Sequence, residues 1–469
     1  MITAARPRWL RYRRGHSANA REAANGAKKE SQRQDQGKAQ EDLAHRGDYP
    51  QKNQGFRRSM SASTVIRDRF TFAMVVSGAK TFRRTLQGAS THMKSKYVQL
   101  ACILVLASGA LAIRSVPLLA TSAEYASLSA RNLYAVNQSS KNRGSISIYD
   151  IDAGHRLIKT IHTVPDVGDV RGVAVSAVTG KLYVAYRNNA GVGMIYCVNV
   201  NNETVLWNKA INPGVDRLAI NPNGQLLYVP TGEEGSANYI NVVDANAGDI
   251  VRRVYFSNRS HDTLYPLSGP IFQETKATDG SGHYLYLIDP SSYAVSRIGP
   301  YSGILGPYAV DGTSSYAVNN VTNLWGMQVV NLKTGQIITA NIPNHPSSGD
   351  VGLLHGIGWS PDQSEVWQSS TWNDPQIYVW DTLNPMAPIL KKRLALRSSR
   401  GAHWLTFDIR GDHAYVAPNK NSDEDTEIFN TRAHTSVGVI GSSEDMLEID
   451  FLNGKISQVG DQFAIGRAR

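Results

Sequence analysis

The most constraining feature of this 469-residue chain is a strand–turn unit that recurs about seven times between Asn132 and the C-terminus. Each unit holds a short apolar run, a Gly or Asp turn, an aromatic-rich run, a polar loop, and a third run before another turn. The first part of the unit is clear in VDRLAINPNG at Val215–Gly224 and in IGWSPDQ at Ile357–Gln363. A period of roughly 20–50 residues that encodes only strands and turns indicates a β-propeller.

The spacing of the aromatic-rich runs predicts the number of blades. Taken as the second strand of each unit, these runs begin near Asn132, Lys181, Gln225, His283, Ser315, Ser364 and His413, with Lys455 as a further candidate. The distance from residue 132 to residue 455 corresponds to about 46 residues per unit over seven units, as four-stranded blades require. The sequence therefore predicts an all-β fold, a seven-bladed β-propeller of four-stranded blades.

A split blade is predicted to close the ring. The first unit begins at its second strand, Leu133–Asn137, and Met446–Leu452 is predicted to supply the missing first strand. Closure matters because an open series of blades would leave two sheet edges able to pair with other chains. Lys455–Val459 competes with Leu133–Asn137 for the place beside this strand, which leaves eight blades as the alternative.

The repeats resemble a known family. The units QLLYVPTGEEGSANYINVVDANAGDIVRRV at Gln225–Val254 and KLYVAYRNNAGVGMIYCVNVNNETVLWNK at Lys181–Lys209 are similar to the YVTN (YncE-like) β-propeller repeat. The resemblance covers roughly residues 130–460 and implies a propeller fold. It implies no single activity, because the repeats are structural and function on such a fold depends on the site.

The positive charge of the chain lies outside the repeats. Residues 1–124 hold 22 Lys and Arg against 8 Asp and Glu, a net +14, whereas residues 125–469 hold 27 against 31, a net −4. A mildly acidic repeat region argues against nucleic acid as a partner of the propeller.

The N-terminal quarter is predicted to contain two segments. Residues 1–92 are polar and unpatterned, and are expected to be disordered or to come from an over-extended gene model. Residues 93–123 begin with Met93, continue with the apolar run Val98–Ile113, and offer small residues for cleavage, which is the layout of a signal peptide. A cytoplasmic tail before a signal anchor is the alternative. We expect export to the periplasm or the extracellular space, no stable membrane span after cleavage, and a monomeric propeller over residues 124–469.

Candidate functional residues lie just before the first strand of six units, where they should meet at one mouth of the central channel. They are Arg171, Arg217, Tyr308, His355, His403 and Asp445. Such a ring predicts a pocket for an anionic ligand or a metal, and hydrated residues of an inert channel are the alternative. His355 and His403, with Asp350 or Asp445, would suit a two-His-one-carboxylate metal site, although no local metal-binding motif supports one.

No catalytic motif identifies a reaction. The sequence lacks a Cys pair of metal-binding spacing, a haem attachment motif and a G-x-S-x-G elbow. We therefore expect a binding or scaffold module for an unknown small molecule or protein, with no identifiable cofactor. The alternatives are a lactonase-like hydrolase and a redox protein that binds a quinone or a haem-type cofactor. Cys197 lies in an alternating strand and is expected to be a buried apolar residue.

Overall fold

The computed structural model describes residues 129–232, 237–276, 282–345, 354–371 and 374–463. The predicted basic segment 1–92 and the predicted signal segment 93–123 lie outside these residues. The described part of the chain contains no helix long and apolar enough to cross a membrane.

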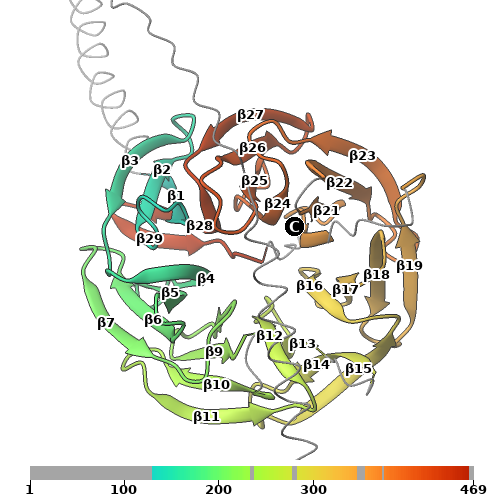
Figure 1. The fold of residues 1–469 in the computed structure, drawn as a ribbon, viewed down its shortest axis with the longest axis horizontal. Helices are drawn as coiled ribbons and strands as arrows, with labels where there is room; N and C mark the ends of the chain where they lie inside the picture. The colour runs from blue at the N-terminus through green and yellow to red at the C-terminus, as the bar shows by residue number, and fades with distance from the viewer. Residues whose placement is uncertain (1–128, 233–236, 277–281, 346–353, 372–373, 464–469) are drawn as a thin grey trace, which may run out of the picture. The chain divides into compact units, whose positions relative to one another are not determined.

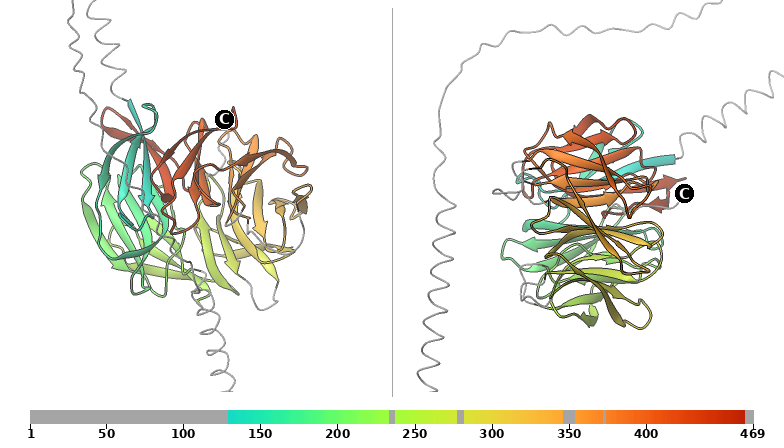
Figure 2. Two further views of the ribbon diagram at one scale, coloured as in Figure 1. Left: turned by 45° about the horizontal axis from the view of Figure 1, so that its top comes forward. Right: turned by 90° about the vertical axis from the view of Figure 1, so that its right-hand side faces the viewer.

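The described chain forms seven antiparallel sheets arranged as a ring of blades around one axis (Figure 1). The prediction of a seven-bladed propeller with a split closing blade is therefore confirmed. Seen from the edge, the blades lie side by side around the ring (Figure 2).

Six blades are continuous in sequence, and their four strands run outward from the channel in chain order. The innermost strands are β4 (Val167–Ser176), β8 (Ala219–Ile220), β12 (Arg259–Leu264), β16 (Leu305–Val310), β20 (Leu354–Trp359) and β24 (Ala402–Phe407). The second strands are β5 (Lys181–Asn188), β9 (Leu226–Pro230), β13 (Ile271–Lys276), β17 (Tyr316–Val321), β21 (Glu365–Ser370) and β25 (His413–Pro418).

The outer half of each blade meets solvent. The third strands are β6 (Gly193–Asn199), β10 (Tyr239–Asp244), β14 (His283–Ile288), β18 (Gly326–Asn331), β22 (Gln376–Asp381) and β26 (Thr426–Asn430). The outermost strands, which are largely exposed, are β7 (Val205–Ala210), β11 (Ile250–Tyr255), β15 (Val295–Tyr301), β19 (Ile337–Asn341), β23 (Ile389–Ala395) and β27 (Thr435–Ile440).

The seventh blade joins the two ends of the described chain. Its strands are β28 (Ser443–Leu452), β1 (Ser129–Asn137), β2 (Ile146–Asp150) and β3 (Arg156–Ile161). β1 pairs with β28 along its full length, with Leu133 opposite Glu448 and Ala135 opposite Met446. A fifth strand, β29 (Lys455–Val459), pairs with the other edge of β28.

Two of the sequence assignments were wrong. The run at His283 is the third strand of its blade, not the second, which is β13. The polar side chains of Gln273, Glu274 and Thr275 are buried in β13, so this strand lacks the apolar pattern of its equivalents. The run at Lys455 neither competes with β1 nor begins an eighth blade, because β1 occupies one edge of β28 and β29 takes the opposite edge.

The recurring Asp or Asn at the end of the third strand shapes the next turn. The carboxylate of Asp244 accepts hydrogen bonds from the backbone N–H groups of Asn246 and Ala247, both at 2.8 Å, and Gly248 follows with φ of +76°. Asn331 does the same for the turn that ends at Gly335. Asp and Asn close such turns with their own side chains, and glycine adopts positive φ without strain. These turns hold the third and fourth strands in register.

The core lies between neighbouring blades. Tyr183 and Cys197 from one blade, for example, pack in one cluster with Leu227 and Val229 from the next. Cys197 is completely buried, as predicted. Packing of sheet against sheet around a closed ring buries both faces of every blade and leaves the innermost strands facing one another across the channel.

Candidate functional site

All the innermost strands except the short β8 share an irregularity in how they pair with the next strand. Where the register between an innermost strand and its partner strand shifts, one or two residues are left unpaired. A β-bulge of this kind bends the strand and redirects the side chains in it. The unpaired residues are Gly168 and Arg171 in β4, His261 and Asp262 in β12, Gly306 and Pro307 in β16, His355 and Gly356 in β20, His403 and Trp404 in β24, and Glu444 in β28.

All six residues predicted from the sequence lie in or beside this layer of bulges. Arg171, His355 and His403 occupy bulge positions, and Arg217 lies just before the short strand β8. Tyr308 and Asp445 are paired residues that follow the bulges of their strands, opposite Asn319 and Val136. All six are buried or nearly so.

Both arginines are already paired with carboxylates. Arg217 Nη2 lies 3.2 Å from Glu444 Oε1 and 3.5 Å from Asp445 Oδ1, and its guanidinium lies 3.4 Å from the centroid of the Trp404 ring. Arg171 Nε lies 2.8 Å from Asp169 Oδ2. The protein's own carboxylates therefore neutralise the guanidinium groups that an anionic ligand would need.

The two histidines stack on each other. Their ring centroids are 3.8 Å apart with planes inclined by 22°. His355 Nδ1 donates to the backbone carbonyl of His403 at 2.7 Å, and His403 Nδ1 lies 2.8 Å from Glu444 Oε1. Burial lowers the pKa of both imidazoles, and for His355 the neighbouring His403 adds to the effect. Asp350, one of the carboxylates predicted to join them at a metal, lies outside the described residues.

The structure adds residues that the sequence prediction missed. Asp216 precedes β8, His261 and Asp262 lie in β12, Glu274 lies in β13, and Glu444 lies in β28. Those in β12 and β13 belong to the blade whose strands were misassigned from the sequence. A run of polar residues in an innermost strand, as in Arg259–Thr263, is the signal that could have identified them.

His261 is held among carboxylates. Its Nδ1 lies 2.6 Å from Glu274 Oε2 and 3.5 Å from Asp262 Oδ2, and its Nε2 lies 4.0 Å from Asp216 Oδ2. Burial opposes a charge on this ring, but the carboxylates of Asp262 and Glu274 outweigh it and raise the pKa of His261 to about 9.

Several carboxylate oxygens of this layer have no hydrogen-bond partner among the described residues. Within the described part of the chain, both oxygens of Asp262 and both oxygens of Asp445 lack a hydrogen-bond partner, as do Asp216 Oδ2 and Glu444 Oε2. Burial raises the pKa of Asp262 and of Asp445 to about 7. Burying a carboxylate without a hydrogen-bond partner costs free energy. A ligand that brings hydrogen-bond donors or positive charge to this layer would therefore be bound favourably.

The C-terminal segment contacts three of the innermost segments next to this layer. The side chain of Gln462 donates to the carbonyl of Leu218 at 2.9 Å and accepts from the N–H of Val173 at 2.8 Å. Trp404 Nε1 donates to the backbone carbonyl of Gln462 at 2.7 Å, and Phe463 is buried beside Trp404. Val173, Leu218 and Trp404 follow Arg171, Arg217 and His403 by one or two positions, so Gln462 and Phe463 lie directly against the charged layer.

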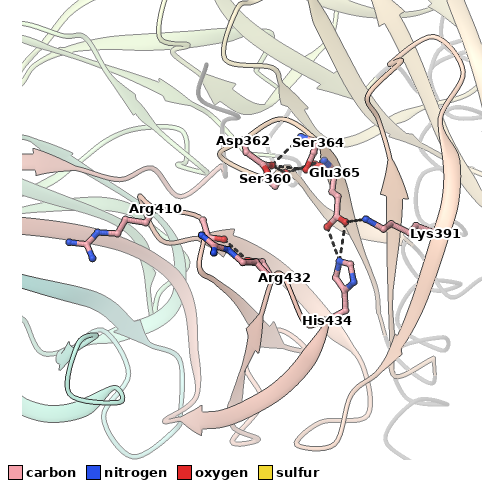
Figure 3. Close-up of a pocket in the computed structure, with 10 residues that line it drawn as sticks. Ser360, Asp362, Ser364, Glu365, Lys391, Arg410, Arg432 and His434 are labelled. Carbon is pink, nitrogen blue, oxygen red and sulfur yellow. Dashed lines mark hydrogen bonds and ion pairs between the residues drawn. The ribbon is translucent and has the colours of Figure 1, made fainter. Parts of the chain in front are cut away.

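A second cavity, of about 150 Å³, lies between the blade of β20–β23 and the blade of β24–β27 (Figure 3). Glu365 at its wall accepts hydrogen bonds from Lys391 at 2.6 Å, from His434 at 2.9 Å and from Trp367 Nε1 at 2.9 Å. Because this carboxylate is fully satisfied, the cavity offers weaker grounds for a ligand site than the channel mouth does.

Comparisons with known proteins agree with the fold and go no further. No protein-family model and no curated protein matches the sequence. A solved structure of a protein from Lactobacillus plantarum is similar, with a TM-score of 0.53 and 13% identity over 71% of this chain and 99% of that one. Hydrazine synthase of Kuenenia stuttgartiensis (TM-score 0.49, 14% identity, 66% of this chain and 97% of that one) and the dihydro-haem d1 dehydrogenase NirN (0.47, 13%, 69% and 75%) also match. At such identities the likeness shows a β-propeller and assigns no specific family.

Proposed function

We propose that this protein is a binding module whose channel mouth takes a small ligand that brings positive charge or hydrogen-bond donors. The observation that carries the proposal is the pair of fully buried carboxylates, Asp262 and Asp445, that lack hydrogen-bond partners among the described residues. Leaving such a group unsatisfied costs about 1–3 kcal/mol or more, and a bound donor or cation would offset that cost. Of the two ligands predicted from the sequence, an anion or a metal, the site thus favours the one with positive charge.

We also propose that this chain belongs to the YVTN family and that it is exported. The tyrosine-valine strands and the Asp-to-Gly turns support the family, and the segment that begins at Met93 supports export. N-terminal sequencing of the exported protein should find a start between Ile113 and Glu124. Peptides from residues 18–52 in that protein would contradict export by this segment.

A lactonase-like hydrolase is the second candidate, and one observation favours it. His403 has a lowered pKa, and Glu444 orients its ring through Nδ1. A neutral imidazole oriented by a carboxylate is the arrangement of a general base. Hydrolysis of a simple lactone, followed in a pH-stat and lost in His403→Gln, would support this candidate. The redox alternative required Arg171 and Arg217 to bind the carboxylates of a cofactor. Both arginines are paired with carboxylates of the protein itself, so this alternative loses its support.

The binding proposal can be tested with three defined probes. Spermidine supplies cationic donors, glucose neutral hydroxyls and citrate carboxylates. Thermal unfolding should show that spermidine raises Tm of the wild type and that citrate does not. The shift should shrink in Asp445→Asn, measured against that variant's own Tm without probe, and should be unchanged in Glu365→Gln, which alters the second cavity. Stabilisation by citrate alone would restore the anionic-ligand prediction and overturn this one.

A further inference from the structure

Two neighbouring blades bring three metal-ligating side chains together at the channel mouth. Asp216 comes from the segment that enters β8, whereas His261 and Asp262 come from β12 of the next blade. One ligand atom from each lies within 4.8 Å of the others, and all three residues are at most 3% exposed. The backbone N–H of Thr263 donates to the carbonyl of Arg217 at 3.1 Å, which fixes the two segments against each other.

An independent observation points to a ligand at this cluster. Asp262 is completely buried, and neither of its carboxylate oxygens has a hydrogen-bond partner among the described residues. Among the same residues, Asp216 Oδ2, which faces this cluster, also lacks a hydrogen-bond partner, and its nearest cation is Arg171 Nη1 at 3.5 Å. Buried charged groups are normally paired or coordinate metals, and a cation between these carboxylates would satisfy both.

The surroundings of His261 match those of a metal-bound imidazole. Its Nδ1 is held at 2.6 Å by Glu274, which directs Nε2 toward Asp216. Glu274 is itself paired with Lys276 at 3.1 Å. Ligating histidines commonly use their second nitrogen in this way, because a carboxylate partner fixes the orientation of the ring and raises its basicity.

We propose that Asp216, His261 and Asp262 form a binding site for a divalent transition-metal ion. The inference rests on the proposed function, since it gives a chemical identity to the cationic ligand of the same channel mouth. Two carboxylates and one imidazole suit Zn²⁺ or Mn²⁺, whereas Ca²⁺ requires six to eight oxygen ligands. Three protein ligands would leave at least one coordination position open for a second molecule.

Titration of metal into tag-free, full-length protein after removal of metals by EDTA tests this site. We expect calorimetry with ZnCl₂ or MnCl₂ to show about one ion per chain. Asp262→Asn and Asp216→Asn should each weaken binding by about 100-fold or more, since even second-sphere changes cost about 10–100-fold. Glu274→Gln, which changes only the orienting carboxylate, should lie within that smaller range.

Glu365→Gln is the matched control, because Glu365 is also a buried carboxylate that contacts a histidine, in another part of the ring. It should bind metal like the wild type. Circular dichroism confirms that each variant is folded. Co²⁺ provides a direct readout, because its visible bands report nitrogen and oxygen ligands and should disappear in Asp262→Asn.

The results distinguish failure of the metal site from failure of the proposed binding function. Absence of Zn²⁺ and Mn²⁺ binding to the wild type would overturn the metal site, as would equal binding to every folded variant. If spermidine still raised Tm in the same sample, the proposed binding function would survive that result. If neither metal nor spermidine bound, both proposals would be overturned.

Discussion

The buried carboxylate of Asp445 makes the channel polar and lowers the stability of the folded protein. It is completely buried and lies 3.5 Å from Arg217, and neither oxygen accepts a hydrogen bond among the described residues. Burial opposes its charge more strongly than Arg217 favours it, so its pKa rises to about 7. When such a group is replaced, the protein commonly gains stability and loses function.

The predicted effect of Asp445→Asn depends on pH. Between pH 4 and 7 the unfolded chain releases this proton before the folded chain does, so the wild type loses stability as the pH rises through that window. Asn resembles the protonated acid and does not titrate. Urea denaturation should therefore find the variant more stable than the wild type at pH 8, with the difference vanishing near pH 4.

Asp423→Asn serves as the control for this measurement. Asp423 is exposed and accepts hydrogen bonds from Ser139 and Ser140, which lower its pKa. Its replacement should produce no gain in stability at pH 8. An equal gain in both variants would show that overall charge, rather than burial of Asp445, governs the effect.

The single described thiol provides a second residue-scale prediction. Cys197 is completely buried, and burial raises its pKa to about 12. Because the thiolate is the reactive form, Cys197 in the folded protein should resist a disulfide reagent such as DTNB for hours and react at once in urea. Rapid reaction without denaturant would show that the blades around it open readily.

Among the elements, the innermost strands approach one another so closely that some positions require glycine. A Cβ on Gly356 would lie 2.8 Å from Trp404 Cα, and one on Gly172 would lie 2.9 Å from Arg217 Cα. Gly356 is itself a bulged residue of the charged layer, and Gly172 directly follows the bulged Arg171. The close contact of backbones therefore sets the diameter of the channel mouth and the distances between its charged groups.

Replacement of one of these glycines should be costly. Gly356→Ala forces backbone to move, and overpacking of this kind costs about 1–3 kcal/mol. Gly438→Ala in the outermost strand β27 is the control, because a Cβ there meets nothing within 4 Å. Chemical denaturation should separate the two variants by at least about 1 kcal/mol. Equal stabilities would show that the innermost strands are more loosely packed than the contacts indicate.

At the scale of the whole molecule, stability depends on closing the ring. β28 pairs with β1 from the other end of the described chain, and its residues Met446, Leu447 and Ile449 are fully buried between blades. Each large apolar side chain withdrawn from water contributes about 1.5–3 kcal/mol. Loss of the strand would also expose sheet edges that can pair with other chains.

Truncation tests this closure. A chain ending at Ser442 should lose cooperative thermal unfolding and aggregate, because the lost burial is comparable with the roughly 5–15 kcal/mol stability of an ordinary domain and one edge of β1 is left unpaired. A chain ending at Phe463 keeps β28, β29, Gln462 and Phe463, and should unfold at the same temperature as the parent. A cooperative transition at the parental temperature in the shorter chain would contradict closure by β28.

The fold class, the seven blades and the split closing blade could be predicted from the sequence because their causes are local. Alternating strands, Asp-to-Gly turns such as Asp244–Gly248, and a first unit that lacks its first strand are visible along the chain. The prediction failed at β12–β14, where buried polar residues replace the apolar pattern. That failure concealed His261, Asp262 and Glu274, three members of the charged layer.

Only the tertiary structure decided which charges meet. Arg217 and Glu444 are 227 residues apart in the chain, yet closure of the ring brings them to 3.2 Å, so the arginine is paired within the protein rather than left for an anionic ligand. The sequence by itself predicted that charged residues would gather along the innermost strands of a propeller. Their pairing, and hence the carboxylates left over for a cation, depends on distances that exist only when all seven blades have closed.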